Sequence, residues 1–226
     1  MKTAILAFIK TGVKNTWFNT RYMQNKRNKY INYVKSKYNY DNNPSIICSN
    51  CIGGIIYNNL GLQFLSPTIN MWMTNKDLIK FASNIQEYIA AELVDSGKYE
   101  GYPTGKLLDI TLYLNHYATF EEAKIKWDDR KKRIHYDNLY IIMGDGGLNY
   151  EDFKGLNSIP CKRLITFTAK DYPEFDYTFQ LKKYEKESSV GFFAVKDLDG
   201  FREFEKEFDY VNWLNGESKL ENTYKI

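Results

Sequence analysis

The sequence predicts an α/β protein with a mainly parallel sheet and helices on both faces, a Rossmann-like three-layer arrangement. Three observations lead to this fold class. Short apolar runs alternate with amphipathic segments along residues 44–226. Glycines and hydroxyl or acidic capping residues mark the ends of those segments. At 226 residues, of which 43% are hydrophobic and 26% charged, the chain is long enough to bury the core of such a sheet.

The expected strands are short apolar runs bounded by turn residues. In chain order they are Ser45–Cys48, Ile69–Met73, Leu108–Leu114 and Leu139–Met143, followed by segments within residues 162–168, 177–182 and 191–195. The stretch "DSGKYEGYPTGK", residues 95–106, is glycine-rich and polar, so we expect a loop there.

The expected helices combine a capping residue with apolar positions three and four apart. They cover Ile52–Leu60 before Gly61, the segment from Thr74 to Leu93, the charged segment from Thr119 to Arg133, and residues 150–157 and 201–216. Strands that alternate with helices in this way favour a parallel sheet.

The first forty residues form a basic arm. Nine lysines and arginines and no acid give residues 1–40 a charge of +9, which leaves −6 on the remainder of a chain whose net charge is +3. Ile5, Ile9, Val13 and Trp17 recur every four residues, as in an amphipathic helix. The sequence therefore predicts a basic helical arm over residues 1–43 and an α/β body over residues 44–226.

Two roles are open for this arm. Its apolar face can pack on the body as a first helix, which is the more common use of such a stripe. Alternatively, residues 1–40 can lie on an anionic membrane surface. The longest apolar run, Ala4–Ile9, is too short to cross a bilayer. No nucleic-acid partner is expected, because the body is acidic and carries no recognisable nucleic-acid module.

Three candidate catalytic residues follow predicted strands. Cys51 follows Ser45–Cys48, His116 follows Leu108–Leu114, and Asp145 follows Leu139–Met143. Because ligands bind beyond the carboxyl ends of parallel strands, these side chains are expected at one rim if the strands are neighbours. A cysteine at a helix N-terminus favours the thiolate, His116 would activate it, and Asp145 would orient the imidazole. The alternative is a packed cysteine, a histidine satisfied by backbone and an aspartate that serves the turn.

The cysteines do not form a redox or metal motif. Cys48 and Cys51 have C-x-x-C spacing, but Cys48 belongs to a predicted buried strand and only Cys51 precedes the helix. Three cysteines are too few for a disulfide framework, so a reducing cytoplasm is expected. We predict no metal site, and the sequence indicates no particular cofactor.

Three segments carry a resemblance to a known family: "SNCIGGIIYNNLGLQFLSPTINMWM", "YPTGKLLDITLYLNHYATFEEAKIKWDDRKKRIHYDNLYIIM" and "FDYVNWLNG". They resemble a bacterial family of unknown function whose members are commonly labelled exopolysaccharide (capsule) biosynthesis proteins. The resemblance covers Ser45 to Gly216 and implies an α/β fold and a link to surface glycan assembly, but no reaction. The matching motif residues are Ser49, Asn50, Cys51, Gly53, Gly54, Tyr57, Pro67, Tyr102, Pro103, Gly105, His116, Tyr117, Trp127 and Arg130.

The function that we predict is transfer of an acyl or glycosyl group to a sugar or lipid-linked sugar, in the cytoplasm and at the membrane periphery. Cys51, His116 and Asp145 are the expected catalytic residues. The expected substrate-binding residues are Ser49, Asn50, Gly53, Gly54, Tyr57, Tyr102, Lys106, Tyr117 and Arg130. Two alternatives stay open, a glycan-binding or assembly module without catalysis and a cysteine-dependent hydrolase.

Overall fold

The computed structural model describes residues 21–225, which divide into two compact units. One unit is formed by residues 40–191, and the other by residues 21–39 together with residues 192–225. The C-terminal segment thus clusters with the N-terminal helix, whereas the sequence grouped it with the body.

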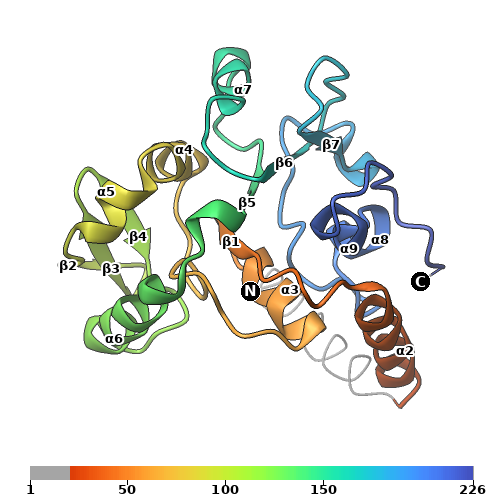
Figure 1. Ribbon diagram of the computed structural model, residues 1–226, viewed down its shortest axis with the longest axis horizontal. Helices are drawn as coiled ribbons and strands as arrows, with labels where there is room; N and C mark the ends of the chain where they lie inside the picture. Colours follow the sequence, from red (N-terminus) through yellow and green to blue (C-terminus); the bar gives the residue numbers. More distant parts are fainter. Residues whose placement is uncertain (1–20, 226) are drawn as a thin grey trace, which may run out of the picture. The chain divides into compact units, whose positions relative to one another are not determined.

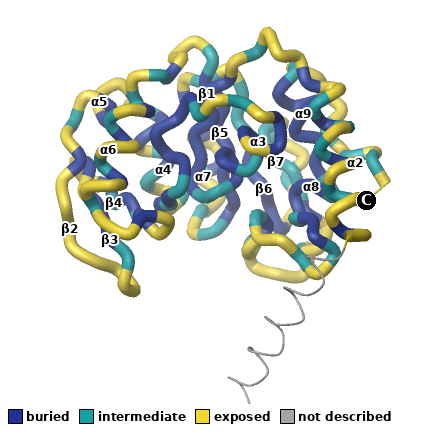
Figure 2. The backbone as a smooth tube through the Cα atoms, turned by 90° about the horizontal axis from the view of Figure 1, so that it is seen from below, coloured by how far each residue is buried: buried dark blue, intermediate teal, exposed yellow. Residues whose placement is uncertain are grey.

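The unit of residues 40–191 is built on a four-stranded parallel sheet. Its strands are β1 (Ser45–Cys48), β5 (Leu139–Gly144), β6 (Arg163–Thr168) and β7 (Thr178–Gln180), and they lie side by side in that order (Figure 1). Every neighbouring pair is parallel. Figure 2 shows β1 and β5 buried along their whole length. The prediction of a mainly parallel sheet is therefore confirmed.

Helices cover both faces of this sheet. Helix α3 (Ile52–Leu60) packs on the face of Ile46 and Cys48, so closely that a Cβ added to Gly53 would lie 2.9 Å from the Cys48 sulfur. Helices α4 (Asn75–Ser83) and α7 (Tyr150–Leu156) share a hydrophobic core with Ile47 and Ile141 on the opposite face. Successive side chains of a strand point to opposite faces, which explains this division.

A second, antiparallel sheet lies in the same unit. It contains β2 (Val94–Tyr99), β3 (Tyr102–Leu107) and β4 (Ile110–Tyr113), in that order. The prediction of a loop over residues 95–106 is wrong, because these residues form the β2–β3 hairpin. Glu100 and Gly101 both have positive φ, 50° and 91°, as a two-residue hairpin turn requires. Every residue of β2 is exposed, so the strand carries no apolar alternation to reveal it.

Three further predictions differ from the structure. Ile69–Met73 forms a single bridge, between Trp72 and Tyr113, instead of a strand. Residues 191–195 form no strand. The C-terminal helix is two short helices, α8 (Glu203–Glu207) and α9 (Tyr210–Leu214), separated by an extended Phe208.

The expected N-caps and the C-terminal glycine of α3 are confirmed, although the segment expected as one helix from Thr74 to Leu93 is divided at Asn84. Thr74 accepts a hydrogen bond from the Asp77 N–H before α4, and Thr119 accepts one from the Glu122 N–H before α6 (Phe120–Arg130). Gly61 ends α3 in the left-handed conformation, at φ 72°. The other helices are α5 (Ile85–Ala90) and the short 3₁₀ turns η1 (Lys131–Arg133), η2 (Tyr136–Asn138) and η3 (Lys182–Tyr184).

The second unit is organised around a buried carboxylate. Helix α2 (Arg21–Lys37) buries Met23, Tyr30 and Val34 and contacts α9. The Arg27 guanidinium donates two hydrogen bonds of 2.7 Å to the two carboxylate oxygens of the fully buried Glu205. A helix over residues 21–37 of the basic arm is thus present, and the stripe from Ile5 to Trp17 lies outside the described residues. None of the helices in residues 21–225 is long and apolar enough to cross a membrane.

Replacement of Arg27 by Met is expected to destabilise this unit. Burial raises the pKa of Glu205, but the hydrogen bonds and charges of Arg27 and Arg202 outweigh it and hold that pKa below its ordinary value. Removing Arg27 takes two charge-assisted hydrogen bonds from a buried carboxylate and leaves Arg202 as its remaining cationic partner, so we expect a loss of about 3 kcal/mol in the free energy of unfolding. Urea unfolding measures this loss, with the exposed Lys29→Met as the matched control.

The pH dependence of this effect has a definite sign. Because the pKa of Glu205 is lower in the folded state, its stabilising contribution is present above its unfolded pKa and is lost as the pH falls through the folded value. The difference between the native protein and Arg27→Met should therefore shrink in acid. A difference that grows as the pH falls would contradict the ion-pair explanation.

Candidate functional site

Cys51 and His116 meet in the unit of residues 40–191. The Cys51 Sγ lies 3.1 Å from the His116 Nε2, although 65 positions separate the two residues in the chain. Cys51 is half-buried and directly precedes α3, while His116 is exposed in the loop between β4 and α6. The distance is that of a hydrogen bond, so the imidazole can take the thiol proton directly.

A backbone bridge brings the two loops together. The Met73 N–H donates to the Ser49 carbonyl oxygen at 3.0 Å, just after β1. The adjacent Trp72 exchanges two backbone hydrogen bonds with Tyr113 of β4, at 2.9 and 2.8 Å. Cys51 follows Ser49 by two residues, and His116 follows Tyr113 by three. The juxtaposition was predicted from neighbouring parallel strands, but β4 belongs to the antiparallel sheet, and the bridge is the actual cause.

Tyr117 and Arg130 hold the loop that carries His116. The Tyr117 hydroxyl donates to the Ile69 carbonyl oxygen at 3.1 Å, and the Arg130 Nη1 donates to that oxygen and to the Tyr117 hydroxyl, at 3.0 and 2.8 Å. Both side chains are buried. Burial raises the pKa of Tyr117 although the Arg130 charge opposes the shift. These two residues, which we expect to contact substrate, take part in this internal network.

The turn around Cys51 is also occupied by internal contacts. The Asn50 Oδ1 accepts a hydrogen bond from the Ile52 N–H at 2.9 Å, and the Asn50 carbonyl oxygen accepts one from the Cys48 thiol at 3.0 Å. Gly53 and Gly54 are buried, where a Cβ would press on Cys48 or Ile69. These glycines therefore allow close packing of α3, instead of the approach of substrate that was expected.

Cys51 differs chemically from the other two cysteines. Cys48 is fully buried, and burial raises the pKa of its thiol to about 12. Burial likewise raises the pKa of the Cys161 thiol to about 11. None of the three cysteines forms a disulfide. A thiolate is the reactive form of cysteine, so Cys48 and Cys161 are poor nucleophiles at neutral pH.

Asp145 does not orient His116. One oxygen of its buried carboxylate accepts a hydrogen bond from the Ala169 N–H at 2.8 Å, and the other accepts one from the Val190 N–H at 2.7 Å. Burial raises the pKa of Asp145, and these bonds oppose that rise. In residues 21–225 no hydrogen bond joins it to His116. Asp145 does follow β5 as predicted, but it ties the ends of β5 and β6 and the Val190 segment together.

The other predicted binding residues are scattered. The Tyr57 hydroxyl is buried between the Pro44 carbonyl oxygen and the Ile46 N–H. Ser49 is buried and contributes the carbonyl oxygen of the bridge. The Lys106 Nζ donates to the Asp109 carbonyl oxygen at 3.0 Å. Tyr102 lies half-buried on the antiparallel sheet, where its hydroxyl accepts a hydrogen bond from the Trp72 indole at 3.3 Å.

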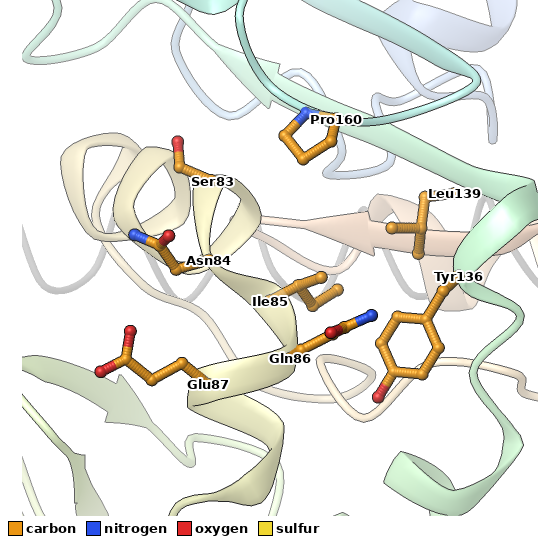
Figure 3. Close-up of a pocket in the computed structure, with 8 residues that line it drawn as sticks. All are labelled: Ser83, Asn84, Ile85, Gln86, Glu87, Tyr136, Leu139 and Pro160. Atoms are coloured by element: carbon orange, nitrogen blue, oxygen red, sulfur yellow. The ribbon is translucent and has the colours of Figure 1, made fainter.

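A cavity elsewhere in this unit does not include the cysteine site. Its volume is about 450 Å³, and Asn84, Gln86 and Tyr136 are among its lining residues (Figure 3). Leu139, the first residue of β5, also lines it, so it lies at the amino end of the strand. Cys51 follows the carboxyl end of the parallel neighbour β1. Within residues 21–225 no group of three or more His, Cys, Asp or Glu side chains is placed to hold a metal ion.

Sequence comparison assigns the family. Residues 22–215 match the family described as a domain of unknown function, DUF1919. The chain belongs to this family. A Haemophilus influenzae protein described as uncharacterized is 32% identical over 194 residues, which cover 84% of this chain and 94% of that protein. A Dictyoglomus thermophilum protein-L-isoaspartate O-methyltransferase is 30% identical over 86 residues, 37% of this chain and 36% of that protein.

Alkylation is expected to select Cys51 in this DUF1919 protein. Iodoacetamide at neutral pH should modify Cys51 first, because burial raises the pKa values of Cys48 and Cys161 to about 12 and about 11. Peptide mass spectrometry after a brief reaction identifies the labelled residue, and Cys51→Ser serves as the control. Labelling of Cys161 at the same rate as Cys51 would contradict this assignment.

Replacement of Asp145 by Ala should reduce stability without changing the reactivity of Cys51. It leaves the buried N–H groups of Ala169 and Val190 without their acceptor, at a cost of roughly 1–3 kcal/mol each. Urea unfolding measures this loss, with the exposed Asp171→Ala as the control. If Asp145→Ala folds but its Cys51 is alkylated much more slowly than in the native protein, Asp145 does orient His116.

Proposed function

We propose that this protein is an acyltransferase that uses Cys51 as its nucleophile and His116 as its general base and acid, with a sugar hydroxyl as the acceptor. The observation that carries the proposal is the 3.1 Å distance between the Cys51 Sγ and the His116 Nε2. A nucleophile within hydrogen-bond distance of a base is the arrangement that covalent catalysis requires.

The first half-reaction forms a thioester. His116 takes the proton of the Cys51 thiol, and the thiolate attacks the carbonyl carbon of an ester or thioester donor. The bond from that carbon to the leaving oxygen or sulfur breaks, and the leaving group receives the proton from His116. The acyl group is then attached to Cys51, with no change in oxidation state.

The second half-reaction releases the acyl group to the acceptor. A sugar hydroxyl loses its proton to His116 and attacks the thioester carbonyl. The bond from carbon to the Cys51 sulfur breaks, the thiolate regains the proton, and an ester of the sugar is released. Water in place of the sugar would give a hydrolase, so the acceptor decides between the two reactions.

Two considerations support the choice of a sugar acceptor and its compartment. The sequence resembles proteins labelled as exopolysaccharide biosynthesis proteins, and the sugar assignment begins from that resemblance. Three cysteines without a disulfide suit a reducing compartment, so we place the reaction in the cytoplasm. Attachment of the basic arm to an anionic membrane would bring the enzyme close to lipid-linked sugars.

An aryl ester tests the proposed nucleophile. Mixing the protein with excess p-nitrophenyl acetate should release a burst of p-nitrophenol and leave one acetyl group on Cys51, detected by peptide mass spectrometry. Cys51→Ala should abolish both signals. His116→Ala should slow acylation by about 10²–10⁴-fold, the usual contribution of a positioned general base. Cys161→Ala is the matched control, with the burst retained.

The acceptor is tested on the acetylated protein. Addition of a neutral tetrasaccharide should speed the loss of the acetyl group from Cys51 and yield an acetylated sugar. Release of acetate alone, at a rate independent of sugar, would favour the hydrolase. Acetylation of other residues without a burst at Cys51 would contradict both enzymatic functions.

A further inference from the structure

Four aromatic side chains gather on the antiparallel sheet. Trp72 and Tyr113 stack with their ring centroids 3.7 Å apart and their planes within 5° of parallel. Tyr99 contacts Tyr113 and Tyr102 edge to face, with centroids 5.2 and 5.8 Å apart, and also approaches Trp72. We call Trp72, Tyr99, Tyr102 and Tyr113 the aromatic shelf.

The aromatic shelf lies on the face of the sheet that points away from the core. Ile110 and Leu112 of β4 are fully buried, whereas Tyr113 is half-buried, as the alternation of a strand requires. Trp72 and Tyr102 are also half-buried, and Tyr99 is 44% exposed. Rings that are packed on one another and still open to solvent offer a rigid surface to a ligand.

The backbone bridge connects this shelf to the cysteine site. Tyr113 precedes His116 by three residues, so their Cα atoms are at most about 11 Å apart. Trp72 is bonded through its neighbour Met73 to Ser49, two residues before Cys51. A ligand a few sugar rings long that rests on the aromatic shelf is therefore within reach of the thiol.

We propose that the aromatic shelf is the subsite that binds a neutral sugar ring of the acceptor glycan. The role of this sugar as the acceptor rests on the proposed function, whereas its binding does not require catalysis. A sugar ring presents a flat face of C–H groups with partial positive charge, which packs on the negative face of an aromatic ring. The hydroxyl groups of the sugar can form hydrogen bonds with the Tyr99 and Tyr102 hydroxyls at the edge of the shelf.

An acidic side chain beside the shelf favours a neutral sugar over a phosphate-bearing ligand. The Glu100 carboxylate, in the hairpin turn beside the shelf, raises the pKa of Tyr99 chiefly through its charge. A carboxylate at this position repels phosphate groups and accepts hydrogen bonds from sugar hydroxyls. A nucleotide would stack equally well on the rings but would place its phosphates in this unfavourable field.

The aromatic shelf differs from the set of tyrosines that the sequence predicted to bind substrate. Tyr57 and Tyr117 are buried with their hydroxyls engaged, so they present no ring to a ligand. Trp72, Tyr99 and Tyr113 were not predicted as binding residues: Tyr99 fell in the segment expected to be a loop, and the pairing of Trp72 with Tyr113 joins residues that are distant in the chain. Of the predicted residues, Tyr102 alone belongs to the aromatic shelf.

Saturation-transfer NMR on the Cys51→Ala protein tests the subsite without turnover. The probes are maltotetraose, cellotetraose and chitotetraose, with AMP as the competing class. At least one tetrasaccharide should bind saturably, and Tyr99→Ala should weaken its Kd about tenfold, as expected when an anchoring ring is lost. Tyr99→Phe should retain most of the affinity because it keeps the ring.

The controls separate this inference from the proposed function. Tyr22→Ala removes a tyrosine of α2 that is more exposed than Tyr99, 67% against 44%, and should leave tetrasaccharide binding intact. Trp72→Ala should weaken binding like Tyr99→Ala, and Tyr99 decides the result if the Trp72 variant does not fold. Failure of all three sugars to bind, binding of AMP in their place, or an unchanged Kd in Tyr99→Ala would each overturn the shelf assignment. The burst at Cys51 is measured separately and judges the catalytic proposal alone.

Discussion

The arrangement of the candidate site depends on one short stretch of extended backbone, Trp72–Met73. Its hydrogen bonds to Ser49 on one side and to Tyr113 on the other join the exit of the parallel sheet to the last strand of the antiparallel sheet. Without this bridge, nothing in the chain order would place the turn after β1 beside the loop after β4. The contact between Cys51 and His116 is a consequence of these few backbone bonds.

Burial around the bridge gives it a defined geometry. Met71 and Met73 are buried in the core that α4 and α6 share, and the alternate residue Trp72 faces outward onto Tyr113. Behind the His116 loop, Arg130 and Tyr117 close on the Ile69 carbonyl oxygen. A buried guanidinium is costly unless it is fully hydrogen-bonded, so this network has little freedom to rearrange. The exposed imidazole is thus mounted on a rigid support.

Several residues that the sequence predicted to act on substrate have structural roles. The Asp145 carboxylate accepts backbone N–H groups from two segments that follow β6, and Gly53 and Gly54 permit α3 to lie against β1. Each of these residues stands where a parallel sheet commonly binds a ligand. The Asp145 side chain joins backbone segments at this end of the sheet, and the missing side chains of the two glycines allow α3 to pack there. We propose chemistry for the thiol and imidazole pair and ligand binding for the aromatic shelf next to it.

Local signals were sufficient for much of the fold. Apolar runs predicted β1, β5 and β6, and the caps at Thr74, Thr119 and Gly61 predicted the ends of three helices, because periodicity and capping act within a few residues. The β2–β3 hairpin escaped prediction because β2 is exposed on both faces and its turn uses Glu100–Gly101 in place of a more common pair.

By itself, the sequence determined the parallel α/β core and the three residues whose chemistry was worth testing. Only the tertiary structure decided which of them meet, since hydrogen bonds across 65 positions follow from strand pairing and burial that no local pattern encodes. It paired Cys51 with His116 through the bridge and assigned Asp145 to the amides of Ala169 and Val190. It also exposed the aromatic shelf, because the face on which a ring lies is set by the register of a strand.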